Sequence, residues 1–414
     1  MEPLRLKRLI EDQRQEFLAK KPGVIREVKW RDLLSLERIL AVTGIRRAGK
    51  STLLRQIAEE EKYSFAYLNF DDIRLSGFQE DDYTTILSSY SALSEKTVFL
   101  FDEIQMAPAW ERFLRRLHDI GRMVVVTGSN TSILSDELGS HLTGRYLKQE
   151  LFPFSFREYL RFCGNSQKMP VSTAEADILL KCSIEYMENG GFPEYLPNQR
   201  RELLEHLFID IITRDIIARH GIQGRSGFRD LALYLMSHAG CRMSYGKLAG
   251  TMGFRSATSA KEYLGFMEDA YLLFQLRRFD WSLKRSMLSP RKIYPIDNGL
   301  SSAVSFNISP DRGHKLETAV FLELKRNGEV WYYSGKSECD FIAGNSSSRS
   351  CIQVCWYLDN ENRQRELRGL NEAMDFFKLN TGTIVTLNQE EVIEENSGKR
   401  ISVVPFWKWA LDHN

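Results

Sequence analysis

Short apolar runs alternate with amphipathic segments over the first 130 residues of the chain. Four of the runs have the length of a buried strand and end in polar or glycine residues, at positions 38–43, 63–70, 96–103 and 123–127. Between them, segments such as 52–58 and 108–120 repeat apolar residues at the three- and four-residue spacing of a helix face. This pattern predicts a doubly wound parallel α/β sheet, whose ligands bind at the carboxyl ends of the strands.

The rest of the chain follows other patterns. Residues 1–37 predict an amphipathic helical lead-in, and residues 175–220 predict helices that break at Gly190-Gly191. Three short helical stretches and an apolar strand come next, at 228–238, 244–251, 256–268 and 271–276. An amphipathic helix at 316–325 then precedes three predicted strands, at 330–333, 339–343 and 351–356. These runs predict further domains beyond the first sheet.

The stretch Gly44-Ile-Arg-Arg-Ala-Gly-Lys-Ser51 fills every fixed position of the phosphate-binding pattern G-x-x-x-x-G-K-[ST]. It follows a predicted strand and opens a predicted helix, which is the context that the pattern requires. Glycines let main-chain N–H groups curl around a polyphosphate, Lys50 would reach the β and γ phosphates, and the Ser51 hydroxyl would ligate Mg²⁺. We therefore predict ATP and Mg²⁺ as cofactors, and the expected nucleotide contacts are Gly44, Ile45, Arg46, Arg47, Ala48, Gly49, Lys50, Ser51 and Thr52.

Two acids, Asp102 and Glu103, end the predicted strand at 96–103. We expect Asp102 to hold Mg²⁺, and Glu103 to orient and deprotonate an attacking water molecule. An acid pair at this place favours hydrolysis over simple binding of the nucleotide. Asn130 follows the next predicted strand, where it would sense the γ-phosphate or position water; the alternative is a turn residue.

The ordered series of motifs resembles one family. The phosphate loop, Phe99-Leu-Phe-Asp-Glu103, Thr127-Gly-Ser-Asn130, Leu142-Thr-Gly-Arg145 and Leu151-Phe-Pro-Phe-Ser-Phe-Arg-Glu-Tyr159 look like the AAA+ related prokaryotic ATPases often called archaeal-type ATPases. Gly190-Gly-Phe-Pro-Glu194, Thr213-Arg-Asp215 and Lys292-Ile-Tyr-Pro-Ile-Asp-Asn-Gly-Leu300 resemble the subset with a C-terminal domain of unknown function. The resemblance covers nearly the whole chain.

The resemblance implies a role for Arg145, which corresponds to the arginine of a short Gly-Arg motif. Such an arginine contacts the γ-phosphate, in cis or across a subunit boundary of a homo-oligomer, and stabilises charge in the transition state. The alternative for Arg145 is a surface salt bridge. Arg46 and Arg47 would act similarly or would pair with Asp71 or Asp72.

The helices between 175 and 220 are similar to the helical lid that follows an AAA+ sheet, and Arg214 and Asp215 would face the nucleotide or an interdomain seam. The three short helices that follow have the outline of a winged helix-turn-helix, whose third helix could lie in a DNA major groove. Duplex DNA is therefore a candidate partner; the alternative is a lid or a protein-docking module. The candidate DNA contacts are Arg255, Lys261, Arg277 and Arg278, and the basic run continues through Lys284, Arg285, Arg291 and Lys292.

The last predicted unit resembles the restriction-endonuclease-like fold. There a Glu on a helix, an Asp on a strand and an acid-x-Lys on the next strand bind Mg²⁺ and activate water. Glu317 and Asp340 fill the first two positions, but Gln353 replaces the acid and Cys355 replaces the lysine. A neutral amide weakens metal binding and a thiol is no cation. We therefore expect a degenerate site used for binding or assembly, unless Lys336 supplies the lysine.

Composition changes this picture little. The chain has 414 residues, of which 43% are hydrophobic and 27% charged, and its formal charge of +1 excludes a strongly basic protein but not local basic patches. No run approaches the ~20 apolar residues of a membrane span, and the start is too charged for a secretory signal. We thus expect a cytoplasmic protein with no membrane partner. The six cysteines form no C-x-x-C pair, so neither a disulfide framework nor a common zinc site is expected.

We predict five units: a helical lead-in (1–37), a P-loop ATPase core (38–160), a helical lid (161–225), a winged-helix domain (226–290) and a restriction-endonuclease-like domain (291–414). The first hypothesis is a Mg²⁺-dependent AAA+ ATPase that couples nucleotide turnover to movement of the last two domains, on DNA or on another partner. A slow nucleotide-gated switch or scaffold is the alternative, and an ATP-dependent nuclease is a weaker one. A small-molecule kinase is disfavoured, because no acceptor pocket is recognisable.

Overall fold

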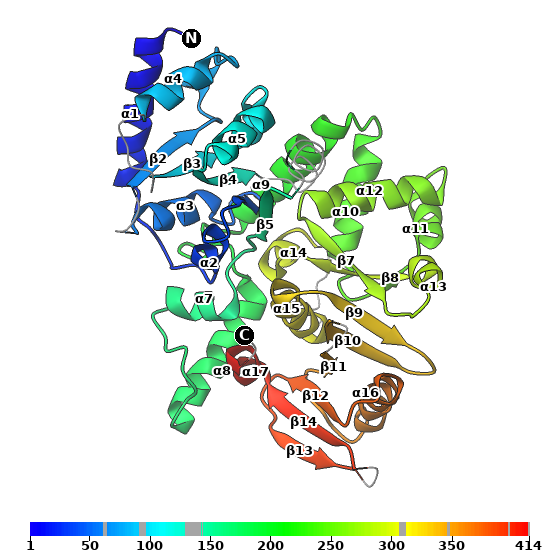
Figure 1. The fold of residues 1–414 in the computed structure, drawn as a ribbon. Coiled ribbons are helices and arrows are strands. Elements are labelled where there is room, and N and C mark those ends of the chain that lie inside the picture. Colours follow the sequence, from blue (N-terminus) through cyan, green and yellow to red (C-terminus); the bar gives the residue numbers. More distant parts are fainter. Residues whose placement is uncertain are drawn as a thin grey trace. The chain divides into compact units, whose positions relative to one another are not determined.

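The computed structural model describes residues 1–60, 64–90, 97–128, 142, 144–305, 312–345, 348–395 and 398–412 (Figure 1). The chain divides into two units, Met1–Phe152 and Pro153–Asn414. Each unit is built on its own β-sheet, and the five-unit division stays a prediction.

Five parallel strands form the sheet of the first unit, in the order β2-β3-β4-β1-β5. Their bounds are β1 (Ile39–Thr43), β2 (Ser64–Asn69), β3 (Thr97–Asp102), β4 (Met123–Gly128) and β5 (Tyr146–Glu150). The predicted parallel sheet is confirmed, but β5 was not predicted, because this edge strand is half-exposed and has no apolar run. Since β4 lies between β1 and β3, the residues that follow β1 and β3 flank its carboxyl end.

Alternate residues of these strands enter two separate cores. Ile39 and Ala41 of β1 point to one core, and Leu40 and Val42 point to the other. The first core is covered by α1 (Pro3–Ala19), α4 (Asp82–Ser89) and α5 (Trp110–Asp119), and the second by α2 (Trp30–Leu34) and α3 (Lys50–Ala58) (Figure 1). Strands that are apolar on both faces are typical of parallel sheets. Two short 3-10 helices, η1 (Ile73–Leu75) and η2 (Ile104–Met106), follow β2 and β3.

The second unit begins with helices. These are α7 (Phe156–Phe162), α8 (Thr173–Asn189), α9 (Arg201–Asp210), the π-helix η4 (Ile211–Ala218) and α10 (Arg225–Met236). The predicted break at Gly190-Gly191 is where α8 ends. The Thr213-Arg-Asp215 motif lies in η4, and a π-helix of this length is rare.

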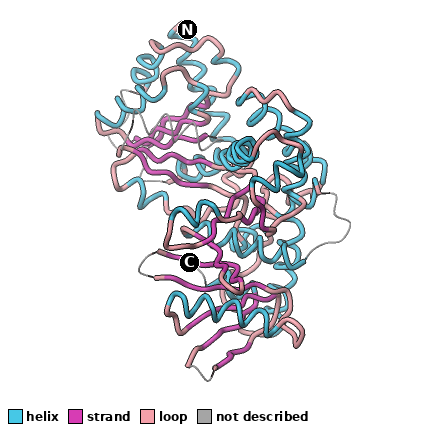
Figure 2. The backbone as a smooth tube through the Cα atoms, turned by 90° about the vertical axis from the view of Figure 1, so that its right-hand side faces the viewer, coloured by secondary structure: helices cyan, strands magenta, loops and turns pink. Residues whose placement is uncertain are grey.

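Nine strands of the second unit form one mixed sheet, in the order β13-β14-β12-β11-β10-β9-β7-β8-β6. The strands of both units are magenta in Figure 2. Their bounds are β6 (Arg242–Met243), β7 (Leu273–Arg278), β8 (Arg291–Pro295), β9 (Val330–Ser334), β10 (Glu338–Gly344), β11 (Arg349–Val354), β12 (Thr381–Thr386), β13 (Glu391–Glu394) and β14 (Arg400–Pro405). β7 pairs with β8 in antiparallel and with β9 in parallel orientation. The sheet therefore continues on both sides of the predicted boundary at residue 290.

The remaining helices of the second unit are α11 (Tyr245–Met252), α12 (Ala257–Asp269), α13 (Leu283–Leu288), α14 (Asn298–Val304), α15 (Arg312–Asn327), α16 (Arg363–Phe377) and α17 (Phe406–Asp412). The three predicted short helices correspond to α10, α11 and α12. Helix α10 starts before the predicted 228–238 stretch. The prediction missed this first turn because Arg225-Ser-Gly227 offers no apolar residue to extend the periodic pattern. Among the helices of the described ranges, none is long and apolar enough to cross a membrane.

The segment Leu151–Phe156 carries the chain from one unit to the next, and hydrogen bonds hold each half. In the first unit, Leu151 N donates to Thr43 O (2.7 Å). In the second unit, three bonds hold the other half: Phe154 N to Gly191 O (2.8 Å), Arg326 Nη2 to Pro153 O (2.8 Å) and Phe156 N to Glu323 Oε1 (2.8 Å). We call Leu151–Phe156 the connecting segment.

Candidate nucleotide-binding site

The loop between β1 and α3 has the backbone shape of an anion cradle. Gly44, Arg47 and Gly49 have positive φ angles of 154°, 65° and 96°. A Cβ atom on Gly44 would lie 2.0 Å from Leu151 O, so only glycine fits there. Gly49 is the N-cap of α3 and has no side chain to cap the first amides of the helix. Those amides and the positive end of the helix dipole are thus available to an anion.

Lys50 opens α3, and its side chain is buried in this loop. Its Nζ donates to Gly44 O (2.9 Å) and to Ile45 O (3.2 Å). The ammonium thus lies inside the curl of the loop, where bound phosphate oxygens would meet it. Ser51 is exposed on the first turn of the helix, so its hydroxyl is accessible to a metal ion. The donors present fit a Mg²⁺-polyphosphate: amides and an ammonium for the phosphates, and oxygen ligands for the metal.

The predicted acid pair ends β3. Asp102 is buried, and its Oδ1 accepts a 2.5 Å hydrogen bond from the Thr127 hydroxyl at the end of β4. Its Oδ2 accepts from the Tyr67 hydroxyl (3.4 Å), and burial raises the pKa of Tyr67, so that this hydroxyl stays a donor. Two neighbouring residues thus orient the Asp102 carboxylate, which suits a metal-binding role.

Glu103 follows in the left-handed region, with φ 49°. Its backbone N donates to Thr127 Oγ1 (3.0 Å), and its carboxylate accepts from Gln105 Nε2 (2.5 Å). Thr127 therefore bonds both predicted acids, although the sequence analysis gave it no role. The available signal was a polar residue at the tip of an otherwise apolar strand.

The sheet brings the loop and the acid pair to one edge. Thr43, which precedes the loop, is in register with Gly128, and Phe101, which precedes Asp102, is in register with Val126. The loop and the acids therefore flank the end of β4, as expected from the predicted parallel order. Asn130, the predicted sensor after β4, lies outside the described residues.

Arg145 forms the salt bridge that was its alternative: its Nε is 3.5 Å from Asp119 Oδ1, and the side chain is about one-third exposed (34%). Arg145 precedes β5, and its backbone O accepts from Ile39 N at the amino end of the parallel sheet, so the expected contact with a γ-phosphate bound in the same chain is wrong. Asp72, a suggested partner of the loop arginines, is bound by Arg74 Nη2 (2.7 Å) and Gln13 Nε2 (2.9 Å). Hydrogen bonding to Arg74 lowers the pKa of Asp72, which keeps it charged.

Arg26 contacts the phosphate loop and was missed by the sequence analysis. Its side chain is buried; Nη1 donates to Ala48 O (2.5 Å), and Nη2 donates to Phe152 O in the connecting segment (2.7 Å). Gln56 of α3 holds the residues before Arg26 in place, because its Nε2 donates to Pro22 O and Val24 O (2.7 Å each). Backbone carbonyls carry no sequence signature, so no motif could have revealed these contacts.

A second cluster of charged residues lies in the other unit, where α15, β10 and β11 bring together Glu317, Asp340 and Gln353. A buried lysine from β8, Lys292, occupies the centre: its Nζ is 2.9 Å from Glu317 Oε1, 2.9 Å from Asp340 Oδ1 and 2.7 Å from Glu338 Oε1. Burial alone would lower the pKa of Lys292, but Asp340 and Glu317 raise it, so the ammonium is charged. We call these residues the lysine cluster.

The rest of the lysine cluster is closed by hydrogen bonds. Gln353 Oε1 accepts from Asp340 N (3.2 Å), and Gln353 Nε2 donates to Glu366 Oε2 (2.6 Å). Tyr294 donates to Glu317 Oε1 (2.6 Å). Among the described residues, no group of three or more His, Cys, Asp or Glu side chains could hold a metal ion.

Two expectations need correction here. Lys292 and Arg291 were assigned to a basic run that could contact phosphates, but both are buried, because β8 is an inner strand of the sheet. Lys336, the suggested replacement lysine, is exposed, and its backbone N donates to Glu372 Oε1 (2.7 Å). The lysine beside the acids comes from β8 instead.

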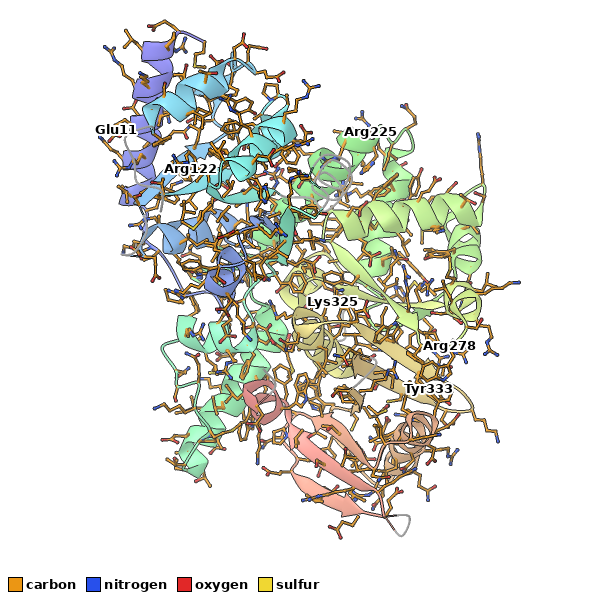
Figure 3. The ribbon with its side chains drawn as sticks, viewed as in Figure 1. Glu11, Arg122, Arg225, Arg278, Lys325 and Tyr333 are labelled. Carbon is orange, nitrogen blue, oxygen red and sulfur yellow. The ribbon has the colours of Figure 1, made fainter. Side chains whose placement is uncertain are left out.

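The predicted DNA contacts lie on the surface of the second unit. Arg255, Lys261 and Arg277 are exposed, and Arg278 is half-buried. Arg255 and Lys261 belong to the start of α12 and the turn before it, and Arg278 ends β7 (Figure 3). The structure therefore leaves Arg255, Lys261 and Arg277 accessible.

Comparison with known proteins gives two family matches: an AAA domain over residues 36–160, and a domain of unknown function over residues 182–312. The uncharacterized protein MJ1544 of Methanocaldococcus jannaschii is 34% identical over 96% of this chain and 93% of its own length. An uncharacterized protein of Haemophilus influenzae is 27% identical over 79% of this chain and 85% of its own length.

Two solved structures are similar at low level. A DNA replication initiation factor shares 15% identity over 63% of this chain and 88% of its own, with a TM-score of 0.25. A STAND ATPase with a tetratricopeptide repeat sensor from Pyrococcus horikoshii shares 14% identity over 75% of this chain and 47% of its own, with a TM-score of 0.27. With the AAA domain match and the near full-length similarity to MJ1544, this chain belongs to the family of AAA+ P-loop ATPases of archaea and bacteria that contains the MJ1544 protein.

Proposed function

We propose that this chain binds ATP with Mg²⁺ at residues Gly44–Thr52 and hydrolyses it. The observation that carries the proposal is one edge of a parallel sheet that presents a cradle of backbone amides, a buried ammonium and an oriented acid pair. A protein that only binds a nucleotide needs the cradle alone, whereas an acid beside the cradle suits activation of water.

Each residue of the site has a distinct role in this proposal. Lys50 releases its loop carbonyls and binds phosphate oxygens, and the first amides of α3 bind the rest. Ser51 and Asp102 would hold Mg²⁺, which supplies charge neutralisation at the phosphates. Glu103 accepts the proton of the attacking water. Arg145 lies at the amino edge of its own sheet, opposite the loop, so it would reach only the γ-phosphate of a neighbouring subunit, after leaving Asp119; Asn130 would act as a sensor.

A slow nucleotide-gated switch is the second candidate. It is favoured by one observation: the Glu103 carboxylate accepts a 2.5 Å hydrogen bond from Gln105, which ties up the proposed base. Turnover then requires that this bond open. A steady-state hydrolysis rate that is slow and unchanged by duplex DNA would support the switch. Strong stimulation by DNA would support an ATPase that couples turnover to movement of the last two domains.

Two variants test the ATPase. Lys50→Ala should weaken ATP binding by roughly 10- to 100-fold, since a charge-assisted hydrogen bond contributes about 1.5–3 kcal/mol. Glu103→Gln should retain ATP binding but lower the hydrolysis rate by about 10²-fold or more, because the base is lost. Calorimetric titration with ATP and a phosphate-release assay measure the two effects, and the exposed Lys20→Ala is the control. Wild-type hydrolysis by Glu103→Gln would show that another group is the base.

The connecting segment is the proposed route from nucleotide to second unit. The loop touches it at both ends: Gly44 packs on Leu151 with no room for a Cβ atom, and Ala48 is joined to Phe152 through the Arg26 guanidinium. A nucleotide that displaces the loop must therefore also displace Leu151 and Phe152, or break these contacts. The next residues are bonded into the second unit, so the displacement reaches that unit along the chain.

Replacing Arg26 tests this route. Arg26→Met keeps the length of the side chain but removes both hydrogen bonds, so hydrogen exchange of the 151–156 peptide should no longer respond to saturating ATP analogue. The wild type should show the response, and Arg31→Met, which breaks an exposed ion pair with Glu60, should retain it. ATP affinity of Arg26→Met should fall by about tenfold. An unchanged exchange response in Arg26→Met would exclude the route.

Duplex DNA is the proposed partner of the second unit. Helices α10, α11 and α12 with strands β6, β8 and β7 follow the order of a winged helix-turn-helix. The first turns of α12 expose Lys261 and the residues after Arg255, with Glu262 as an exposed acid. Exposed cations beside a helix that is free on one face suit phosphate contacts.

Salt dependence tests the DNA proposal. Duplex affinity should fall as KCl rises between about 50 and 200 mM, and Arg255→Ala and Lys261→Ala should each reduce the slope of log K against log salt by about 1. Fluorescence anisotropy with a labelled duplex measures the slopes. Lys181→Ala, which removes an exposed lysine of α8, should leave the slope unchanged. Equal slopes for the wild type and all three variants would mean that DNA binds elsewhere on the chain or does not bind.

The lysine cluster is proposed to be structural and not a nuclease centre. In the restriction-endonuclease-like interpretation, its acids would bind Mg²⁺, but here an ammonium contacts both of them and a neutral Gln353 stands beside them. A metal ion could enter only by expelling a buried cation. The site then serves assembly, since Lys292 joins β8 to α15 and β10.

Two measurements on Lys292→Met test this role. The variant should unfold with about 3–5 kcal/mol less free energy than the wild type, because Glu317 and Asp340 lose their buried counterion. Denaturant titration measures the difference, and Lys336→Met, which changes an exposed lysine, is the matched control. Plasmid DNA should remain uncut by the wild type with Mg²⁺ or Mn²⁺. Cutting that disappears in Asp340→Asn would establish a nuclease.

A further inference from the structure

An exposed apolar patch lies on and beside α13, between β7 and β8. Trp281, Leu283, Met287 and Leu288 are between 52% and 76% exposed, although they are separated by at most seven positions in the chain. Scattered apolar side chains are normal on a protein surface, but a local group of this kind marks an interaction site. We call these four residues the α13 patch.

Hydrogen bonds to the residues before and after α13 hold the α13 patch in place. Ser286 donates to Arg278 O (2.7 Å), and Arg291 donates to Ser286 O (3.0 Å) and Met287 O (3.1 Å). Asp280 accepts from Ser282 N (2.8 Å) just before the helix. A preorganised surface loses little conformational entropy on binding, whereas a floppy loop would lose much.

Aromatic contacts hold Trp281 of the α13 patch in place. Trp281 packs edge-on against Phe279 (5.1 Å between ring centroids) and is stacked at 6.2 Å on Phe376 of α16. The Arg349 guanidinium lies 5.1 Å from the Trp281 ring and 5.0 Å from the Phe279 ring. The patch is thus a firm projection on the sheet, near the end of β7 where Arg278 and Tyr333 are labelled in Figure 3.

Cations surround these apolar side chains. Residues 277–292 contain six Lys or Arg and one acid, Asp280. Two of the cations, Arg291 and Lys292, are buried, but Arg277, Lys284 and Arg285 are exposed. Asp280 is itself paired with Arg285 (3.0 Å). The matching partner therefore has a negative surface and an apolar interior that a side chain can enter.

Duplex DNA fits this description better than a membrane. Its phosphates supply the negative surface, and a partly opened base step accepts apolar wedges such as Leu and Met, flanked by cations on the phosphates. Membrane-binding helices bury a long apolar face, whereas α13 has only six residues. The proposed DNA-contacting helix α12 leads directly into β7, at the end of which the patch begins.

We propose that the α13 patch is a second DNA contact, in which Leu283, Met287 and Leu288 enter the minor groove and unstack a base step while Arg277 and Lys284 bind the adjoining phosphates. The inference rests on DNA as partner of the second unit and adds a bent or opened duplex as the preferred ligand. It predicts tighter binding to flexible steps than to stiff ones.

The test uses the full-length protein and a duplex that contains 2-aminopurine at a TA step. Binding of the wild type should raise the 2-aminopurine fluorescence. The double variant Leu283→Ser with Leu288→Ser should bind about tenfold more weakly with an unchanged salt slope and no fluorescence rise, because no cation is lost. Lys284→Ala should do the reverse: a smaller slope, with the fluorescence rise retained.

The matched control is Val171→Ser, which alters the most exposed large apolar side chain of the described residues (92%) and should change nothing. Unchanged duplex binding by the double variant would overturn this inference alone. If that variant instead loses binding to phosphatidylserine vesicles, or changes the mass of an oligomer, with duplex affinity intact, the patch faces a membrane or a second copy. A wild type that binds ATP but no duplex would overturn this inference together with the DNA proposal and leave the ATPase proposal standing.

Discussion

Two hydrogen bonds from one buried arginine link the phosphate loop to the exit of its unit. Arg26 donates to the backbone carbonyls of Ala48 and Phe152, each of which would cost about 1–3 kcal/mol if left buried and unsatisfied. A planar guanidinium can bond both at once, which a lysine ammonium on a flexible stem does with less precision. The loop shape needed for phosphates and the position of Phe152 are therefore parts of one arrangement, and neither can relax without the other.

The lysine cluster uses a cation differently. A metal ion at the meeting point of Glu317 and Asp340 would exchange with solvent and would polarise water, whereas the Lys292 ammonium is tethered to β8 and pairs with both acids. Three carboxylates around one ammonium leave excess negative charge. Burial and the neighbouring Asp340 raise the pKa of Glu317, against the opposing effect of Lys292. Removing the desolvation cost by an apolar replacement of the whole cluster could even stabilise the fold, so its retention is better explained by the specific register that it imposes on β8, α15 and β10.

The sequence predicts what depends on contiguous residues. The phosphate loop, Asp102 and Glu103 follow strands whose apolar runs are recognisable, and parallel order then brings them to one edge. Arg26 and Lys292 escape such reasoning because their partners are remote in the chain: a basic side chain in a loop or in a Lys/Arg-rich run gives no sign that it will be buried. Edge strand β5 escapes it because an edge position needs no apolar run. The joining of β7 to β9 depends on tertiary packing between segments that were read as separate domains.

That joined sheet limits which movements nucleotide binding can drive. β7 and β9 exchange backbone hydrogen bonds, β7 also pairs with β8, and Lys292 of β8 adds buried ion pairs to α15 and β10. Separating the helix-turn-helix part from the last strands would break the hydrogen bonds between β7 and β9, whereas local flexing elsewhere would leave them intact. The chain passes from the first unit to the second through the connecting segment. In the proposed function, the parts of the second unit that this sheet joins would therefore respond together to a displacement of the connecting segment: β7 with the α13 patch that follows it, and β8 with the lysine cluster.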